Sequence, residues 1–368
     1  MRISGTLEEA AGPGVLCHVR GSRAARLRLL QDGVVAIRPT LDAVARRAGV
    51  SLATASRVVN GSARVSDTTR AAVEAAVAEL GYLANPAARM LARRRTDTIA
   101  LVISEPEDRV FADPFFPPVV HGIAASLADT ELQLVLLPAR GDRQQRKVER
   151  YVLAGHVDGV VMLSLHADDL LPRALADAGV PIVASGRVSG LDSVPFVDVD
   201  NRGGARIATA HLLETSGSVA TITGPLDMTV SADRFKGYRE ALAAAGHHFD
   251  AELVAHGDFT VESGARAAES LLAARPGLRG IFAASDAMAI GALGALSAAG
   301  RGVPEDVSVV GFDDVPAAAS STPPLTTMRQ PFDELGAALT DLLLRRIAGE
   351  AGIDGVVLPA TLVRRRSG

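Results

Sequence analysis

Apolar residues recur at helical spacing near residue 41. Leu41, Val44, Ala45 and Ala48 follow one another at i, i+3, i+4 and i+7, which places their side chains on one face of a helix. The Gly-Val-Ser stretch at 49–51 predicts a tight turn after this helix. Glycine tolerates a sharp bend, and a serine hydroxyl accepts a hydrogen bond from the first N–H groups of a following helix.

The helix that follows this turn also has one apolar face. Ala55, Val58 and Val59 face inward, which leaves four residues facing outward: Leu52, Ala53, Ser56 and Arg57. A third helix is predicted over 66–80, with Ser66 as its cap. Two short helices joined by a tight turn are typical of a helix-turn-helix, whose second helix fits the major groove of B-DNA. This region therefore predicts DNA recognition.

Beyond residue 96 the pattern alternates between strands and helices. Apolar strand-like runs occur at 99–102, 134–137, 159–163, 182–183, 219–222, 281–284 and 307–310, and helical stretches between them include 119–127, 204–213, 232–245 and 287–299. Such alternation predicts parallel sheets that are buried on both faces by helices. The region is long enough for two such lobes with a cleft between them.

The composition fits a small domain joined to a larger one, since the chain has 368 residues. No apolar run approaches the roughly 18 residues needed to cross a bilayer. Arginines interrupt the short apolar pieces between residues 15 and 37, so we expect no secretory signal, no membrane partner and a cytoplasmic protein. A periplasmic binding protein would need that signal and would lack the helix-turn-helix.

Candidate catalytic and metal motifs are absent from the sequence. It has no Walker loop, no Gly-x-Gly-x-x-Gly after a strand, no Gly-x-Ser-x-Gly and no His-Glu-x-x-His. The single cysteine, Cys17, allows no internal disulfide, and the histidines lack metal-ligand spacing. We therefore expect neither an enzyme nor a metal or cofactor.

Charge is distributed unevenly along the chain. The formal net charge is −4, yet residues 39–95 carry nine arginines and four acids, and residues 1–38 carry six arginines and three acids. The remaining residues are strongly acidic. A basic segment that coincides with the helix-turn-helix is the charge pattern expected of a DNA-binding domain on a larger body.

The sequence from Val50 to Gly61 reads Val-Ser-x-x-Thr-x-Ser-Arg-Val-Val-Asn-Gly. It resembles the recognition helix of the lactose-repressor (LacI/GalR) family of bacterial transcription regulators. The segments 65–70, 80–82 and 85–91 continue the resemblance in the same order, and it extends to about residue 366. The resemblance implies an N-terminal all-α helix-turn-helix domain followed by an α/β domain of two Rossmann-like lobes, similar to periplasmic binding proteins.

The resemblance also implies a domain division. We expect residues 1–38 to be disordered or an extension upstream of the natural start, with a helix-turn-helix domain over 39–84. A hinge helix is expected over 85–95, and an effector-binding and dimerisation domain over 96–368. The chain is expected to cross between the lobes near 185–190, 284–286 and 322–326.

Family positions imply which residues meet DNA. Leu52, Ala53 and Arg57 would face base edges, with Arg57 suited to a bidentate contact with guanine and the two apolar residues to a thymine methyl. Phosphates or the helix turn would engage a second set: Thr54, Ser56 and Asn60. In the hinge, Ala88 would let two helices approach, and Leu91 would wedge into the minor groove. The alternatives are that Arg57 binds phosphate only and that Leu91 packs in a core.

The resemblance implies a small-molecule effector in the cleft, since ligands of open α/β sheets bind at the carboxyl ends of strands. Aromatic faces and Asp and Arg side chains suit a sugar, while Gly186 and Ser285 depart from common sugar binders and leave a purine open. Phe115 and Phe259 could instead be core, and Asp313 and Arg234 a structural ion pair. The candidate effector residues are Asp113, Phe115, Phe116, Arg187, Arg234, Phe259, Ser285, Asp313 and Gln330.

These observations together predict a transcription regulator. We expect a homodimer that binds a palindromic operator, acts as a repressor and responds to a small molecule, most simply a sugar. An activator, or a regulator that responds to a purine or another non-sugar ligand, is the alternative. No heptads follow residue 359, so no added tetramerisation coil is expected.

Overall fold

The computed structural model describes residues 39–60, 65–82 and 95–368. They belong to two compact units, an N-terminal helical unit and a larger α/β unit, which are described separately. The expected extension at 1–38 and the hinge residues Ala88 and Leu91 lie outside the described residues. Within the described ranges, no helix is long and apolar enough to cross a membrane.

The N-terminal unit contains the three helices that the spacing predicts. They are α2 (Leu41–Ala48), α3 (Leu52–Val59) and α4 (Asp67–Leu80). Gly49 ends α2 with a left-handed φ of 67°, and Ser51 opens α3 by accepting a hydrogen bond from the N–H of Thr54. The helices share a small core in which Val44, Val58 and Val73 are buried. The predicted helix-turn-helix is therefore confirmed.

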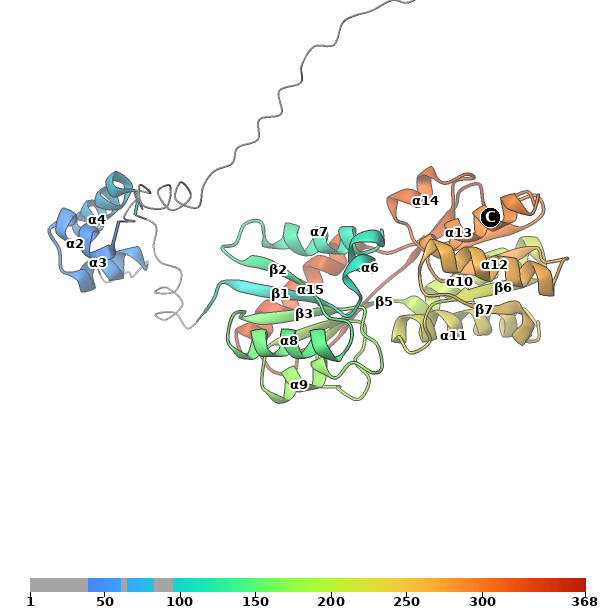
Figure 1. The fold of residues 1–368 in the computed structure, drawn as a ribbon, viewed down its shortest axis with the longest axis horizontal. Helices are drawn as coiled ribbons and strands as arrows, with labels where there is room; N and C mark the ends of the chain where they lie inside the picture. The colour runs from blue at the N-terminus through green and yellow to red at the C-terminus, as the bar shows by residue number, and fades with distance from the viewer. Residues whose placement is uncertain (1–38, 61–64, 83–94) are drawn as a thin grey trace, which may run out of the picture. The chain divides into compact units, whose positions relative to one another are not determined.

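The first lobe of the larger unit is a six-stranded parallel sheet with the order β11-β5-β4-β3-β1-β2. Its strands are β1 (Thr98–Ile103), β2 (Gln133–Pro138), β3 (Gly159–Leu163), β4 (Ile182–Ser185), β5 (Phe196–Val199) and β11 (Val356–Leu358). Its helices are α6 (Glu107–Ala112), α7 (Phe116–Leu127), α8 (Asp142–Leu153), α9 (Leu171–Asp177) and α15 (Phe332–Ile347). Alternate residues of β1 belong to different core clusters on the two faces, so helices cover both (Figure 1).

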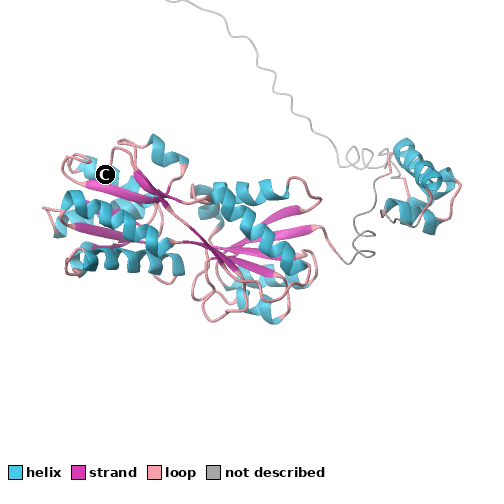
Figure 2. Cartoon of the chain, turned by 180° about the vertical axis from the view of Figure 1, so that it is seen from behind, coloured by secondary structure: helices cyan, strands magenta, loops and turns pink. Residues whose placement is uncertain are grey.

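The second lobe repeats this plan of a sheet flanked by helices (Figure 2). Its strand order is β12-β10-β9-β8-β6-β7. Its strands are β6 (Val219–Thr223), β7 (Val254–His256), β8 (Gly280–Ala283), β9 (Ser308–Asp313), β10 (Thr326–Arg329) and β12 (Thr361–Val363), of which β12 alone runs antiparallel to its neighbour. Its helices are α10 (Asn201–Ser216), α11 (Thr229–Ala244), α12 (Val261–Ala274), α13 (Asp286–Ala298) and α14 (Pro316–Ser320), with a 3-10 turn η1 (Ala251–Leu253). The predicted α/β class with two lobes is confirmed.

The expected crossings between the lobes are wrong. The chain crosses after β5, after β10 and after β11, because α10 and β12 belong to the second lobe whereas α15 and β11 pack on the first. Residues 185–190 instead precede β5, which pairs with β4 and keeps the chain in the first lobe. Residues 284–286 form the turn from β8 into α13, and residues 322–326 lead into β10 beside β9.

The contact between α7 and α15 requires glycine on both helices. A Cβ added at Gly336 would lie 2.3 Å from the carbonyl carbon of Gly122 and 2.5 Å from the backbone nitrogen of Ile123. Backbone atoms cannot yield as a flexible side chain can. We therefore expect Gly336→Ala to lower the free energy of unfolding by about 1–3 kcal/mol, the range for overpacking.

Gly294 on α13 provides the matched control for this substitution. A Cβ there would meet no described atom within 4 Å, so Gly294→Ala should stabilise the helix by about 0.5–1 kcal/mol. Urea unfolding of the two variants beside the wild type measures both effects. A wild-type midpoint for Gly336→Ala would contradict the tight helix contact.

Candidate functional site

Helix α3 presents an exposed face on the N-terminal unit. Leu52 is 51% exposed, and Ala53 and Arg57 are exposed as well. Arg57 forms no ion pair or side-chain hydrogen bond with any described residue, so its guanidinium is available at the surface. The side chains expected to face bases thus share the outward side of the helix.

The three residues expected to meet phosphates or the helix turn are half-buried. The Thr54 hydroxyl lies 2.8 Å from the Ser51 hydroxyl at the start of α3. At the other end, the Asn60 amide donates to the Ser56 hydroxyl at 3.2 Å. These side chains therefore form hydrogen bonds at the two ends of α3.

The larger unit has a cavity at the carboxyl ends of its strands, between the two lobes. The first lobe contributes residues at or after the ends of β3, β4 and β5, and the second contributes residues after β8 and at the end of β9. This is where open α/β sheets bind ligands. All nine residues expected at an effector site line this single cavity: Asp113, Phe115, Phe116, Arg187, Arg234, Phe259, Ser285, Asp313 and Gln330.

Arg234 lies at the centre of the polar wall and is 4% exposed. Its Nε donates to Asn201 Oδ1 at 2.8 Å, and its terminal NH1 donates to the carbonyl of Ala284 at 2.5 Å. The same nitrogen lies 3.4 Å from Asp313 Oδ1. The guanidinium carbon also lies 3.7 Å from the centroid of the Phe312 ring, which holds it flat against the wall.

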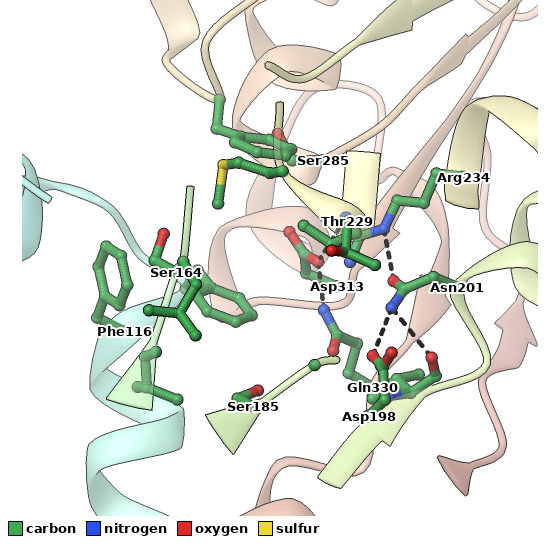
Figure 3. A pocket seen from close by; sticks show the side chains of 18 of the residues that line it. Phe116, Ser164, Ser185, Asp198, Asn201, Thr229, Arg234, Ser285, Asp313 and Gln330 are labelled. Atoms are coloured by element: carbon green, nitrogen blue, oxygen red, sulfur yellow. Dashed lines mark hydrogen bonds and ion pairs between the residues drawn. The ribbon is translucent and has the colours of Figure 1, made fainter. Parts of the chain in front are cut away.

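A chain of hydrogen bonds extends from Arg234 in both directions (Figure 3). On one side, the Asn201 amide donates to Asp198 Oδ1 at 2.8 Å and to the carbonyl of Val199 at 3.0 Å. On the other, the Gln330 amide donates to Asp313 Oδ1 at 2.6 Å. Asp313 and Arg234 therefore do form an ion pair, and that pair is part of the cavity wall.

Burial changes the ionisation of this wall. It raises the pKa of Asp313 to about 7, against the opposing effects of the Arg234 guanidinium and the Gln330 amide. It also raises the pKa of Asp198, which the guanidinium of Arg187 lowers in part. Perturbed carboxylates in a cavity are typical of ligand-binding sites.

The aromatic residues of the cavity differ in exposure. Phe116 is 2% exposed and belongs to the core of the first lobe, whereas Phe115 is half-buried. Their rings pack edge to face with centroids 5.4 Å apart. Phe259 is 8% exposed and enters from the second lobe. Phe115 and Phe259 therefore supply apolar ring surface to the cavity, while Phe116 mainly supports it.

Several side chains join the lobes around the cavity. Arg187 of the first lobe pairs with Asp233 of the second, and the Thr229 hydroxyl donates to the carbonyl of Arg187 at 3.3 Å. His166 Nδ1 lies 2.6 Å from Asp227 across the lobes. Burial alone would lower the pKa of His166, but hydrogen bonds to Glu105 and Asp227 raise it overall. These contacts make the cavity sensitive to how the lobes sit together.

Backbone strain concentrates at the same place. Among the described residues, five other than glycine have a positive φ, and three of them line the cavity: Ser164 (56°), Phe259 (67°) and Asp313 (120°). Such conformations cost free energy and persist where the surrounding structure holds them, commonly at ligand clamps. The strain supports a ligand-binding role for this cavity.

The charges that line the cavity balance. Three arginines each have an aspartate within 4.0 Å: Arg109 with Asp113, Arg187 with Asp198, and Arg234 with Asp313. A ligand entering this cavity therefore meets arginines that already have acidic partners. Three nearby side chains carry atoms that could bind a metal ion: His166, Asp168 and Asp227. These atoms lie within 4.8 Å of one another, but Nδ1 of His166 already forms a hydrogen bond with Asp227.

Further lining residues were not among the candidates from the sequence. They are Arg109, Leu163, Ser164, Leu165, Ser185, Gly186, Asp198, Val199, Asn201, Met228, Thr229 and Val230. The positions after β3 and β4 could have been found from the ends of the predicted strands. Asp198 and Asn201 depend on β5, which was not predicted, and Arg109 lies on the short helix α6. The Asp200 carboxylate caps α10 by accepting a hydrogen bond from the N–H of Gly203 at 2.8 Å.

Comparison with known proteins identifies the family. The model of the lacI family of bacterial regulatory proteins matches residues 40–85, and that of a periplasmic binding protein-like domain matches residues 211–368. The regulator CelR of Thermobifida fusca is 48% identical over 335 residues, covering 90% of this chain and 98% of its own. The chain belongs to the lacI family of bacterial transcription regulators.

Other relatives agree with this assignment. The ribose operon repressor of Escherichia coli strain K12 is 35% identical over 84% of this chain and 93% of its own. Among solved structures, a CelR–cellobiose complex has a TM-score of 0.72 at 46% identity, covering 90% of this chain and all of that one. A Lac repressor dimer bound to operator and an anti-inducer has a TM-score of 0.78 at 30% identity, covering 90% and 99%. The chain is a DNA-binding regulator and not an enzyme.

The raised pKa of Asp313 predicts a pH dependence of stability. The folded state binds this proton more tightly than the unfolded state, in which the pKa is near 3.8. The free energy of unfolding should therefore fall as the pH rises from about 4 to about 7, and this contribution should then level off. In Asp313→Asn that part of the decline should vanish. Urea unfolding at about pH 5 and about pH 7 measures the difference, and equal declines in both proteins would contradict it.

Proposed function

We propose that this regulator is a homodimeric repressor that binds a palindromic operator and responds to a neutral sugar held in the inter-lobe cavity. The observation that carries the sugar part is the cavity wall itself, where paired charges, amides and two aromatic rings meet. The relatives named as repressors support the direction of regulation. A protein that binds DNA as part of this family acts in the cytoplasm.

The balanced charges favour a neutral ligand. A phosphate would bring about two negative charges to arginines that aspartates already neutralise. A sugar hydroxyl instead both donates and accepts, so it can join a carboxylate to a guanidinium, while C–H faces of the sugar pack on Phe115 or Phe259. Cellobiose is the first sugar to test, because the solved structure of the relative CelR is a complex with it.

The proposed DNA contacts follow the exposed face of α3. Leu52, Ala53 and Arg57 are proposed to face base edges, while Thr54, Ser56 and Asn60 hold the ends of the helix near the phosphates. Ala88 and Leu91 are proposed to extend the interface into the minor groove. Their role rests on the sequence resemblance alone.

The proposed control is linkage between sugar and DNA. Both lobes line the cavity, so a bound sugar favours the lobe arrangement that completes its contacts. In a dimer, that arrangement sets the spacing of the two DNA-binding units. A coupling free energy of about 1–3 kcal/mol would change operator affinity by roughly 5- to 150-fold.

Arg57→Ala tests the recognition surface. If Arg57 contacts a guanine, the substitution should weaken binding to an operator selected from a palindromic library by about 1–3 kcal/mol and leave binding to random duplex nearly unchanged. Fluorescence anisotropy on both duplexes measures this, with Arg46→Ala on α2 as a matched control. An equal loss on both duplexes would mean that Arg57 binds phosphate only.

A thermal-shift screen of the full chain tests the effector. Cellobiose at about a hundred times its dissociation constant should stabilise the protein by about 2.7 kcal/mol, a shift of several degrees. Asp313→Asn should abolish the shift, because the carboxylate that accepts a sugar hydroxyl is gone. Glu269→Gln, an exposed acid of the same lobe outside the cavity, should keep it.

The screen also includes ribose, glucose and the purine nucleoside adenosine. A shift with adenosine and with no sugar would replace the sugar by a purine effector. If the sugar is bound but leaves operator affinity unchanged, the proposed control by linkage is wrong.

A further inference from the structure

Arg109 lines the cavity but belongs to no sequence pattern identified above. It lies on α6, and its side chain is 17% exposed. One terminal nitrogen donates to Glu105 Oε2 at 3.0 Å, and Glu105 is itself 2% exposed. The other oxygen of Glu105 accepts a hydrogen bond from the Ser164 hydroxyl at 2.7 Å. The guanidinium is therefore held in place by a buried carboxylate of the same lobe.

The Nε–H of Arg109 remains without an acceptor among the described residues, although Nε is buried. Asp113 Oδ2 lies 3.7 Å from Nε, beyond hydrogen-bonding distance. The other oxygen of Asp113 already accepts from the N–H of Phe115 at 2.9 Å. A buried donor without an acceptor costs free energy, and such groups in native structures commonly mark a functional role.

The same guanidinium reaches the second lobe. Its central carbon lies 5.5 Å from the centroid of the Phe259 ring, within the range of a cation–π contact. Phe259 holds a left-handed φ of 67° there, a conformation that is uncommon for a residue with a side chain. Arg109 therefore connects a buried carboxylate of the first lobe to an aromatic ring of the second, along the wall of the cavity.

We propose that Arg109 is a specificity-determining residue that reads one hydroxyl of the effector. The hydroxyl oxygen accepts from the Arg109 Nε–H, and its proton is donated to Asp113 Oδ2, so a single group bridges the two side chains. The inference rests on the proposed function, since it needs a ligand that carries hydroxyl groups. Because the guanidinium faces Phe259, the same contact favours the closed arrangement of the lobes around the ligand.

A competing explanation is that Arg109 serves only as the counter-ion of Glu105. Arg109→Lys separates the two roles, because lysine keeps a positive charge near Glu105 but lacks the planar group and the Nε–H. Arg140→Lys is the matched control. Arg140 also pairs with carboxylates of the first lobe, Asp168 and Asp169, but does not line the cavity.

The test is calorimetric titration of the full-length variants with cellobiose and with its single-deoxy derivatives. Arg109→Lys should bind cellobiose about tenfold more weakly, the loss expected for one charge-assisted hydrogen bond. The wild type should bind one deoxy derivative, the one that lacks the hydroxyl read by Arg109, as weakly as Arg109→Lys binds cellobiose. Arg109→Lys has already lost that contact, so it should bind this derivative no more weakly than it binds cellobiose. Arg140→Lys should match the wild type on every ligand. Thermal unfolding without ligand checks that both variants are folded.

The outcomes separate this inference from the proposed function. If the wild type binds cellobiose and Arg109→Lys shows the same affinity and the same deoxy pattern, Arg109 is a counter-ion and the sugar proposal stands. If the wild type binds adenosine and no sugar, the sugar proposal fails, and the same variants are titrated with adenosine and its deoxy forms. If Arg109→Lys and the wild type bind those ligands with equal affinities, the inference for Arg109 is overturned.

Discussion

The buried guanidinium of Arg234 organises the larger unit. It contacts Asn201, the first residue of α10, and the carbonyl of Ala284, which directly follows β8. It also pairs with Asp313 at the end of β9. Asn201 in turn bonds to Asp198 of β5, and Gln330 bonds to Asp313. Asn201 and Gln330 lie where the chain passes between lobes, so one network of polar contacts spans two of the three crossings. A buried charge that lost these partners would cost several kcal/mol, which explains why the guanidinium of Arg234 has so many of them.

That network also determines what the cavity can accept. Each arginine of the wall already has its aspartate, so the proposed selectivity for a neutral ligand would rest on the directions of donors and acceptors. Phe259 and Asp313 hold strained backbone angles beside these pairs. A site held rigidly by its own hydrogen bonds loses little entropy when a ligand binds, and it penalises any ligand that leaves a buried partner unsatisfied.

Local spacing was sufficient for the helices of the N-terminal unit and for the long buried strands, because each has a period visible within a dozen residues. Strands β5, β7, β10, β11 and β12 have three or four residues each and were not predicted. The crossings were wrong because β5 and β10 were not predicted, and these strands keep the chain in its lobe by pairing with β4 and β9. Family positions placed all nine candidate residues on one cavity, whereas Arg109 and Asp198 gain their places only through tertiary packing.

Helix α15 and strand β11 complete the first lobe although they follow nearly all of the second along the chain (Figure 1). The first lobe therefore cannot close its core while the chain is still being synthesised, because α15 supplies residues such as Leu335, Leu339 and Leu343 to that core. The helical unit at residues 39–82, in contrast, is contiguous and complete early. During synthesis from the N-terminus, the helices of the N-terminal unit can thus fold before either lobe of the larger unit is complete, because α15 and β12 must first leave the ribosome.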